Sequence, residues 1–256
     1  MSGSDLIGHP SRFLSSPGGK GSYRDAMTVR TVIQRGPKEK KVAAFALDWP
    51  GWSRGAKDPG AAVEVLEAYR DRYRPVAALA GLSAEFEGAG PLEVAEDHVG
   101  VGSTDFWGIS FAPSSFEQEP MGVDELDRKL TLLRAAWTYF DDVAARVSLE
   151  LRLGPRGGGR NRDEIVRHAL GWERADLAKR VGVVVDPIIP PTADGFSSHR
   201  DEFVAALRTY NAEGRMARGR NWTIALLLRH TAFHVLDHAW EMEDRDLSQG
   251  DWRPER

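Results

Sequence analysis

Four long stretches of helical periodicity fill the second half of this chain and restrict its fold more than any other feature. They cover residues 123–151, 161–182, 197–214 and 221–247. In the first stretch, apolar residues recur every three or four positions, the spacing that gives a helix one buried stripe. That stripe consists of Leu126, Leu130, Leu133, Trp137, Phe140 and Ala144. Helices of about 17–28 residues with short or moderate links pack as an up-down four-helix bundle. We therefore predict an all-α bundle over residues 120–256.

The first half of the chain has a different pattern, which predicts a small α+β domain over residues 26–115. Residues 1–25 are rich in Ser, Gly and Pro and lack periodicity, so we expect a flexible leader there. Short apolar runs bounded by turn residues indicate strands, and an Asp-Pro start followed by helical spacing indicates one helix. In chain order the expected elements are strands at 27–36 and 41–51, a helix at 58–81, and strands at 91–100 and 105–111. The predicted order is β-β-α-β-β.

The segment 112–122, "APSSFEQEPMG", separates the two predicted domains. It contains two Pro and two Ser and has no apolar periodicity, which favours an exposed linker. We therefore expect proteases to cleave there first.

Composition narrows the environment and the partners of this chain. The net charge is −4, so no global basic field draws the protein to nucleic acid. No apolar run is long enough to cross a membrane, and the N-terminus lacks the apolar core of a signal peptide. These features predict a cytoplasmic protein. Cysteine is absent, which excludes disulfides and thiolate ligands, so any thiol chemistry needs a thiol from outside.

The most distinctive local pattern is a run of histidines, His230, His234 and His238, each four residues from the next. Residues four apart lie on one face of a helix, so His234 and His238 can bind one ion, and so can His230 and His234. The spacing alone leaves both pairs open. It is also compatible with a wet helix face, or with histidines bonded within a polar seam.

A fourth histidine, His168, offers a third ligand from a neighbouring helix. Ile165, Leu170 and Trp172 flank it, so it lies near an apolar face, where a neutral imidazole needs a partner. A third imidazole would complete a three-histidine site with one or more positions left for water or substrate. Coordination by nitrogen alone suits Zn, Ni, Co or Fe(II) better than Mg or Ca.

The two histidine-bearing stretches, "DEIVRHALGWERADLAKRVG" and "HVLDHAWEMEDR", resemble the DinB/YfiT-like superfamily over residues 123–245. The resemblance implies a divalent metal held by His168 together with His234 and His238, and it leaves His230 outside the site. It also implies a homodimer, and an activity among metal-dependent hydrolases and thiol-dependent transferases or isomerases, such as the mycothiol-dependent maleylpyruvate isomerases.

The stretch "VAAFALDWPGWSRGAKDPGAAVEVLEAYRDRY" is similar to HicB-like domains, with a strand ending in a Pro-Gly turn and then a helix. A HicB-like domain followed by a DinB-like bundle resembles an actinobacterial arrangement.

Two classes of function remain open at this point. In the first, the protein is an enzyme whose metal ion activates water or a small thiol cosubstrate against a small-molecule substrate. In the second, it is a non-catalytic interaction or stress-related binding protein with a structural or vestigial metal site. An open coordination position would favour the first class, and a closed four-ligand site the second.

Further side chains near the histidines are candidates for supporting roles. Trp172 and Trp240 are predicted to line a substrate pocket over the metal, although core packing is the commoner role of such residues. Asp237, Glu241 and Glu173 are candidates to orient the ligands, and they could equally be solvated charges on helices.

The remaining histidines receive simpler interpretations. We expect His98 and His199 on the surface, and His230 partly exposed or bonded within a polar seam.

Overall fold

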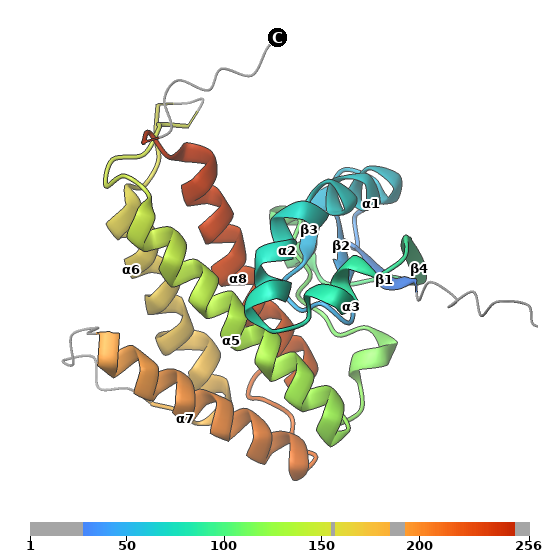
Figure 1. The fold of residues 1–256 in the computed structure, drawn as a ribbon. Helices are drawn as coiled ribbons and strands as arrows, with labels where there is room; N and C mark the ends of the chain where they lie inside the picture. The colour runs from blue at the N-terminus through green and yellow to red at the C-terminus, as the bar shows by residue number, and fades with distance from the viewer. Residues whose placement is uncertain (1–27, 155–156, 185–192, 249–256) are drawn as a thin grey trace, which may run out of the picture.

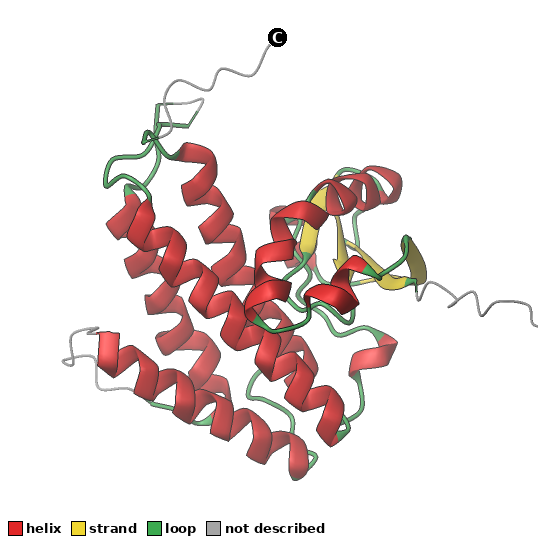
Figure 2. Cartoon of the chain, viewed as in Figure 1, coloured by secondary structure: helices red, strands yellow, loops and turns green. Residues whose placement is uncertain are grey.

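The structure, a computed structural model, describes residues 28–154, 157–184 and 193–248. The leader expected at 1–25 lies outside these residues. An N-terminal region with a four-stranded mixed sheet and helices is followed by a helical region, as Figures 1 and 2 show. This confirms the predicted change from α+β to all-α along the chain.

The sheet has the strand order β3-β2-β1-β4, in which β1, β2 and β3 are joined by two consecutive hairpins. Strands β1 (Val29–Arg35) and β2 (Val42–Ala46) pair antiparallel, as predicted for the first two apolar runs. Strand β3 (Ser53–Ala56) pairs antiparallel with β2, and β4 (Leu92–Val99) pairs parallel with β1. The β2 residues are all buried, so this strand lies at the centre of the core of the N-terminal region.

The predicted order β-β-α-β-β is wrong at two points. Residues 105–111 do not form a strand, because Gly102–Trp107 is the short helix α4, ended by Gly108 in the left-handed conformation (φ 71°). The Asp105 carboxylate accepts hydrogen bonds from the Lys38 and Lys40 backbone and so caps the β1–β2 turn. Strand β3 was not predicted, because "SRGA" has no apolar alternation and is ordered by its pairing with β2.

The helix predicted at 58–81 is divided into α1 (Pro59–Ala68) and α2 (Arg70–Leu79), and α3 (Ser83–Glu87) follows. Asp58 caps α1 as expected, since its side chain accepts a hydrogen bond from the Ala61 amide at 2.9 Å. The division falls at Tyr69, whose backbone leaves the helical region (ψ 1°).

Four long helices make up the second region: α5 (Val123–Arg146), α6 (Arg162–Trp172), α7 (Ala193–Ala212) and α8 (Ile224–Arg245). Helix α5 ends five residues before the predicted boundary, where Val147 adopts an extended backbone. After α6 the chain continues as a π-helical turn, η2 (Glu173–Leu177), and a 3-10 turn, η3 (Ala178–Val181). Among the described residues, no helix is long and apolar enough to cross a membrane.

The segment 112–122 is more firmly held than an exposed linker. It contains the 3-10 turn η1 (Ser115–Glu117), and Ser114, Glu117 and Met121 are buried between exposed neighbours. The Glu117 carboxylate forms a buried ion pair with Arg229 on α8 at 2.7 Å. Arg229 also donates to the Ala112 carbonyl. The Met121 backbone exchanges two hydrogen bonds with the Asn211 side chain, so both ends of the segment are anchored to the helical region.

One hydrophobic core continues from the N-terminal region into the helical region. Trp52 and Tyr73 from the first half and Leu133 and Leu236 from the second belong to the same cluster of buried side chains. At the turn after β2, Gly51 (φ +95°) lies so close to α8 that a Cβ atom would clash with Leu236. Glycine is therefore required where this turn meets the helix.

Candidate metal centre

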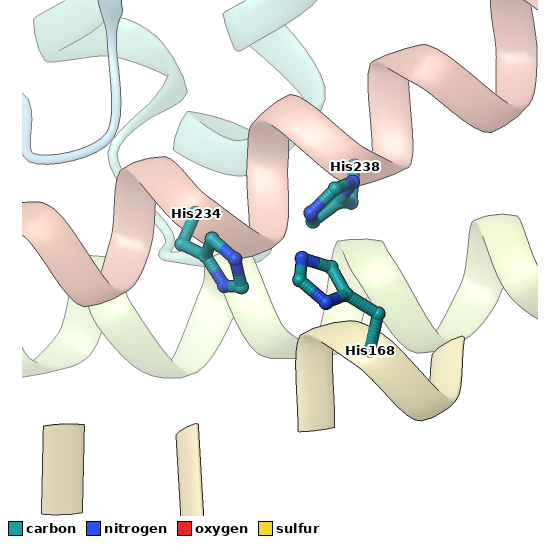
Figure 3. Close-up of side chains that lie close together, drawn as sticks. All are labelled: His168, His234 and His238. Atoms are coloured by element: carbon teal, nitrogen blue, oxygen red, sulfur yellow. The ribbon is translucent and has the colours of Figure 1, made fainter. Parts of the chain in front are cut away.

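His168, His234 and His238 come together between α6 and α8, and their rings face one another (Figure 3). The ring centroids of His234 and His238 lie 4.8 Å apart, and the His168 ring lies 5.5 and 5.0 Å from them. Each residue offers one ring nitrogen, and these nitrogens all lie within 4.8 Å of one another. The three histidines that the sequence analysis selected could therefore hold one metal ion.

Local sequence explains why the rings converge. The Thr223 hydroxyl caps α8 by accepting a hydrogen bond from the Leu226 amide at 3.1 Å, and the helix then continues past both ligands without a break. Helix α6 begins with a capping box, in which the Asn161 and Glu164 side chains each accept a hydrogen bond from the other's backbone amide. These caps fix where each helix starts and hence which direction its histidines face.

The charge state of the cluster fits a cation. Burial, and then repulsion from His238, lowers the pKa of His234 to about 2. The same two causes, in the same order, lower the pKa of His168. Both rings are therefore neutral at pH 7 and carry free lone pairs. The Nδ1 atom of His234 is buried and has no hydrogen-bond partner within the described residues, so the site contains an acceptor that nothing there satisfies.

Glu241 is the acidic side chain that supports the cluster. It approaches His238 Nδ1 at 2.9 Å, and this contact lowers the pKa of the Glu241 carboxyl. A proton on Nδ1 then leaves Nε2 of His238 as the ligand atom. Arg245 donates to the other Glu241 oxygen at 2.7 Å and holds it in place. Sequence reasoning missed Arg245, although the acid-base spacing of four residues signals the pair.

The other two acids have different partners. Asp237 pairs with Arg54 of the N-terminal region at 2.7 Å. Glu173 is fully buried and accepts a hydrogen bond from the Trp137 indole at 2.6 Å.

The two candidate tryptophans lie in different environments in the structure. Trp172 is 42% exposed, and its ring centroid lies 6.2 Å from that of His234, so it borders the cluster. Trp240 is fully buried against the N-terminal region, where it contacts Tyr69 edge-on and lies under the Arg54 guanidinium. Its contacts there are those of a core residue, whereas Trp172 lies where a substrate could reach it.

His230 stands apart from the cluster in every contact. It is buried among aromatic rings, with centroids 5.0 Å from Phe111 and 5.4 Å from Trp222. Burial, and then the Arg229 charge, lowers the pKa of His230 to about 3, although a hydrogen bond with the Ser110 backbone opposes this shift. The expectation of partial exposure is wrong, because the N-terminal region covers this part of α8.

The surface positions expected for His98 and His199 need correction. His199 is buried, because α7 turns this side chain towards Phe203 and Glu173. Burial lowers the pKa of His199 to about 4. His98 is half-buried, with its Nε2 atom 3.0 Å from the Gln34 side-chain amide.

The site therefore combines three imidazoles, one orienting carboxylate and one partly exposed indole, all on α6 and α8. Comparisons of this chain with protein-family models, with curated proteins and with solved structures found no match.

Proposed function

We propose that this protein is a divalent-metal-dependent enzyme in which His168, His234 and His238 hold the ion. The convergence of three ring nitrogens within 4.8 Å carries the proposal. Charged imidazolium rings would repel one another at this distance. Neutral rings can bind one cation together, and because they carry no charge they leave its positive charge in full.

The number of ligands favours an enzyme over a structural site. Among the described residues, three side chains form the cluster and no carboxylate or fourth imidazole joins them. Structural zinc sites are closed by four protein ligands, whereas catalytic sites with three keep a position for water or substrate. This distinction weakens the alternative of a non-catalytic binding protein with a structural ion.

The chemistry follows from the donor set. Three neutral nitrogens suit Zn, Ni, Co or Fe(II), and such an ion would supply a Lewis acid that acidifies a bound water or holds a small thiol as thiolate. Glu241 keeps the His238 ring in one orientation. Trp172 offers a flat apolar surface beside His234 to the body of a small-molecule substrate. Hydrolysis and thiol-dependent transfer or isomerisation are the two reaction classes that we propose.

The wider assignment is part of the same proposal. The arrangement of α5, α6, α7 and α8, with ligands from α6 and α8, supports a four-helix bundle of the DinB/YfiT-like type, joined to a HicB-like domain. A cytoplasmic homodimer that acts on small molecules and does not bind nucleic acid is the form that we propose.

The test begins with protein purified without an affinity tag and stripped by a chelator. After reconstitution with Zn, Ni, Co or Fe(II) separately, elemental analysis should find one ion per chain. A panel of esters, and of electrophiles supplied with a small thiol, should then show turnover that depends on the ion. The absence of stoichiometric metal would overturn the metal centre. A stoichiometric ion without turnover across the panel would favour the binding protein.

A further inference from the structure

A cavity lies on the face of α6 that points away from the histidine cluster, between α5, α6 and α7. Its volume is about 980 Å³, at the upper end of the range for small-molecule sites. None of the three clustered histidines lines it. Arg167 lines this cavity whereas His168 faces α8, because consecutive residues of a helix project about 100° apart. Helix α6 therefore separates two distinct sites.

The inner wall of the cavity is apolar and rigid. It includes Trp137 and Leu170, which are buried, and Phe196, which is partly buried. The Trp137 indole is fixed by its hydrogen bond to Glu173, which η2 turns into the interior. Short π-helical turns inside helices occur frequently at functional sites. The wall thus offers a preformed surface for a flat apolar group.

Arg200 brings a buried positive charge to this wall. Its side chain is 9% exposed, and its guanidinium lies over the Trp137 ring at 5.1 Å. It forms an ion pair with the Asp141 carboxylate at 2.6 Å, and its Nε atom lies 3.6 Å from Glu173. Asp141 lines the cavity and is 54% exposed, so it lies at the open side. Its carboxylate shows that the Arg200 guanidinium can bind a carboxylate at this place. Nε of Arg200 and one Glu173 oxygen are buried without a hydrogen-bond partner in the described part of the chain.

The charges around the cavity favour an anion beside Arg167. Four arginines and two aspartates line it, and two further acids, Asp201 and Glu173, pair with Arg134 and Arg200 from outside the lining. The six lining residues are Arg134, Arg167, Arg174, Arg200, Asp141 and Asp163. Arg167, by contrast, has no ion-pair partner among the described residues. The guanidinium of Arg167, in a cavity that aromatic rings also line, is suited to a planar carboxylate.

Gly171 keeps one side of the cavity open. It lies within α6, where glycine destabilises a helix relative to alanine. A Cβ atom at this position would meet nothing within 4 Å, so no close contact requires the glycine. Its backbone φ is not positive, so conformation does not require it either. What glycine does provide at this position is the space that a larger side chain would take from the cavity.

We propose that this cavity binds a small organic carboxylate with a flat apolar body. The body lies against Trp137 and Phe196, and the carboxylate faces Arg167 and Arg200. This site is separate from the metal centre and does not depend on the enzyme activity proposed above.

The first experiment is calorimetric titration of the full-length, metal-loaded protein with 1-naphthoate. Naphthalene-1-methanol is the neutral probe with the same body, and 1-naphthyl phosphate is the alternative anion. We expect one naphthoate per chain and an affinity roughly tenfold or more above that of the alcohol, as for a charge-assisted hydrogen bond. Equal affinities for naphthoate and the alcohol would overturn anion recognition. Tighter binding of the phosphate would overturn the carboxylate assignment.

Two variants at one position then locate the ligand. Gly171→Leu should project into the cavity and obstruct naphthoate binding, whereas Gly171→Ala adds one carbon into open space and should keep it. Arg167→Gln, at an exposed position that leaves the fold intact, should reduce the preference for naphthoate over the alcohol about tenfold. All three proteins should retain the metal stoichiometry of the parent. Naphthoate binding that survives both Gly171→Leu and Arg167→Gln would show that the ligand lies elsewhere.

Discussion

The two halves of helix α8 contain the same spacing and use it differently. His230 and His238 each lie four residues from His234, so the sequence presents two equivalent pairs. The first half is covered by the N-terminal region, and His230 packs there among Phe111 and Trp222. In the second half, Trp240 also packs on the N-terminal region, but the face that carries His238 turns to α6, where His238 meets His168. The neighbouring element, and not the spacing, decides which pair can bind an ion.

The largest expected effect separates the two pairs directly. His238→Ala should reduce bound metal by far more than the 10–100-fold that is typical of losing a supporting residue, because one of three ligands is removed. His230→Ala, the matched change in the other half, should leave one ion per chain. Elemental analysis after reconstitution and dialysis measures both. His168→Ala and His234→Ala should behave as His238→Ala does.

The opposite pattern, with metal retained in His238→Ala and absent from a folded His230→Ala, would place the ion on the other pair.

The second effect tests what holds the first half of α8 in place. Glu117→Ala leaves the Arg229 guanidinium buried without its carboxylate, which should lower the free energy of unfolding by about 3–5 kcal/mol. Asp127→Ala is the control, because its ion pair with Arg208 is about half exposed and should contribute about 0–1 kcal/mol. Urea unfolding followed by circular dichroism gives both values. Equal losses in the two variants would mean that the buried pair does not anchor the segment 112–122.

The third effect concerns the second half alone. Glu241→Gln removes the charge that orients His238, and metal affinity should fall about 10–100-fold. Asp237→Asn, four residues earlier, removes a similar charge that pairs with Arg54 and should leave affinity unchanged. Competition with a metal-sensitive dye measures both constants. An unchanged affinity in Glu241→Gln would exclude the carboxylate from the site.

The fourth effect is the acid sensitivity of the first half. His230 has a pKa of about 3 in the folded protein and an ordinary value of 6.5, so folding favours its neutral form. The contribution of His230 to the free energy of unfolding is complete above pH 6.5. It is lost as the pH falls towards 3, by at most about 1.4 kcal/mol per pH unit. His230→Phe keeps an aromatic ring but cannot bind the proton. Between pH 6 and 4 the free energy of unfolding should therefore depend less steeply on pH, by up to the equivalent of one proton.

Urea unfolding of both proteins at several pH values, with a chelator present, measures the difference. Other titrating groups are common to both proteins and cancel. Identical slopes would mean that His230 is accessible to protons in the native state.

The sequence predicted some of these features well because their causes are local. The long helices follow from apolar periodicity, and the Asp58 and Asn161 caps were readable from their side chains. The histidine triad was predicted from spacing together with a family resemblance. Strand β3 was missed because only its pairing with β2 orders it, without an apolar pattern of its own. Helix α4 was missed because Asp105 interacts with a turn far earlier in the chain.

Burial by the other region was the main quantity that the sequence could not supply. It separates Trp172 from Trp240 and places His230 in the interior, while His199 is buried by packing within its own region. None of these side chains differs from an exposed one in its local pattern. The contacts that decide between the two histidine pairs, His230 with His234 and His234 with His238, come from α6 and from residues more than a hundred positions earlier in the chain.

The continuous core has a consequence for amide hydrogen exchange. Since β2 and α8 share one set of buried side chains, we expect the slowest amides of both to exchange only when the whole chain unfolds. An ion bound to native His234 and His238 then adds RT ln(1 + [L]/Kd) to that opening free energy, about 2.7 kcal/mol at a hundredfold excess over Kd. Amides of Val42–Ala46, which touch no ligand, should therefore exchange about a hundredfold more slowly when metal is present.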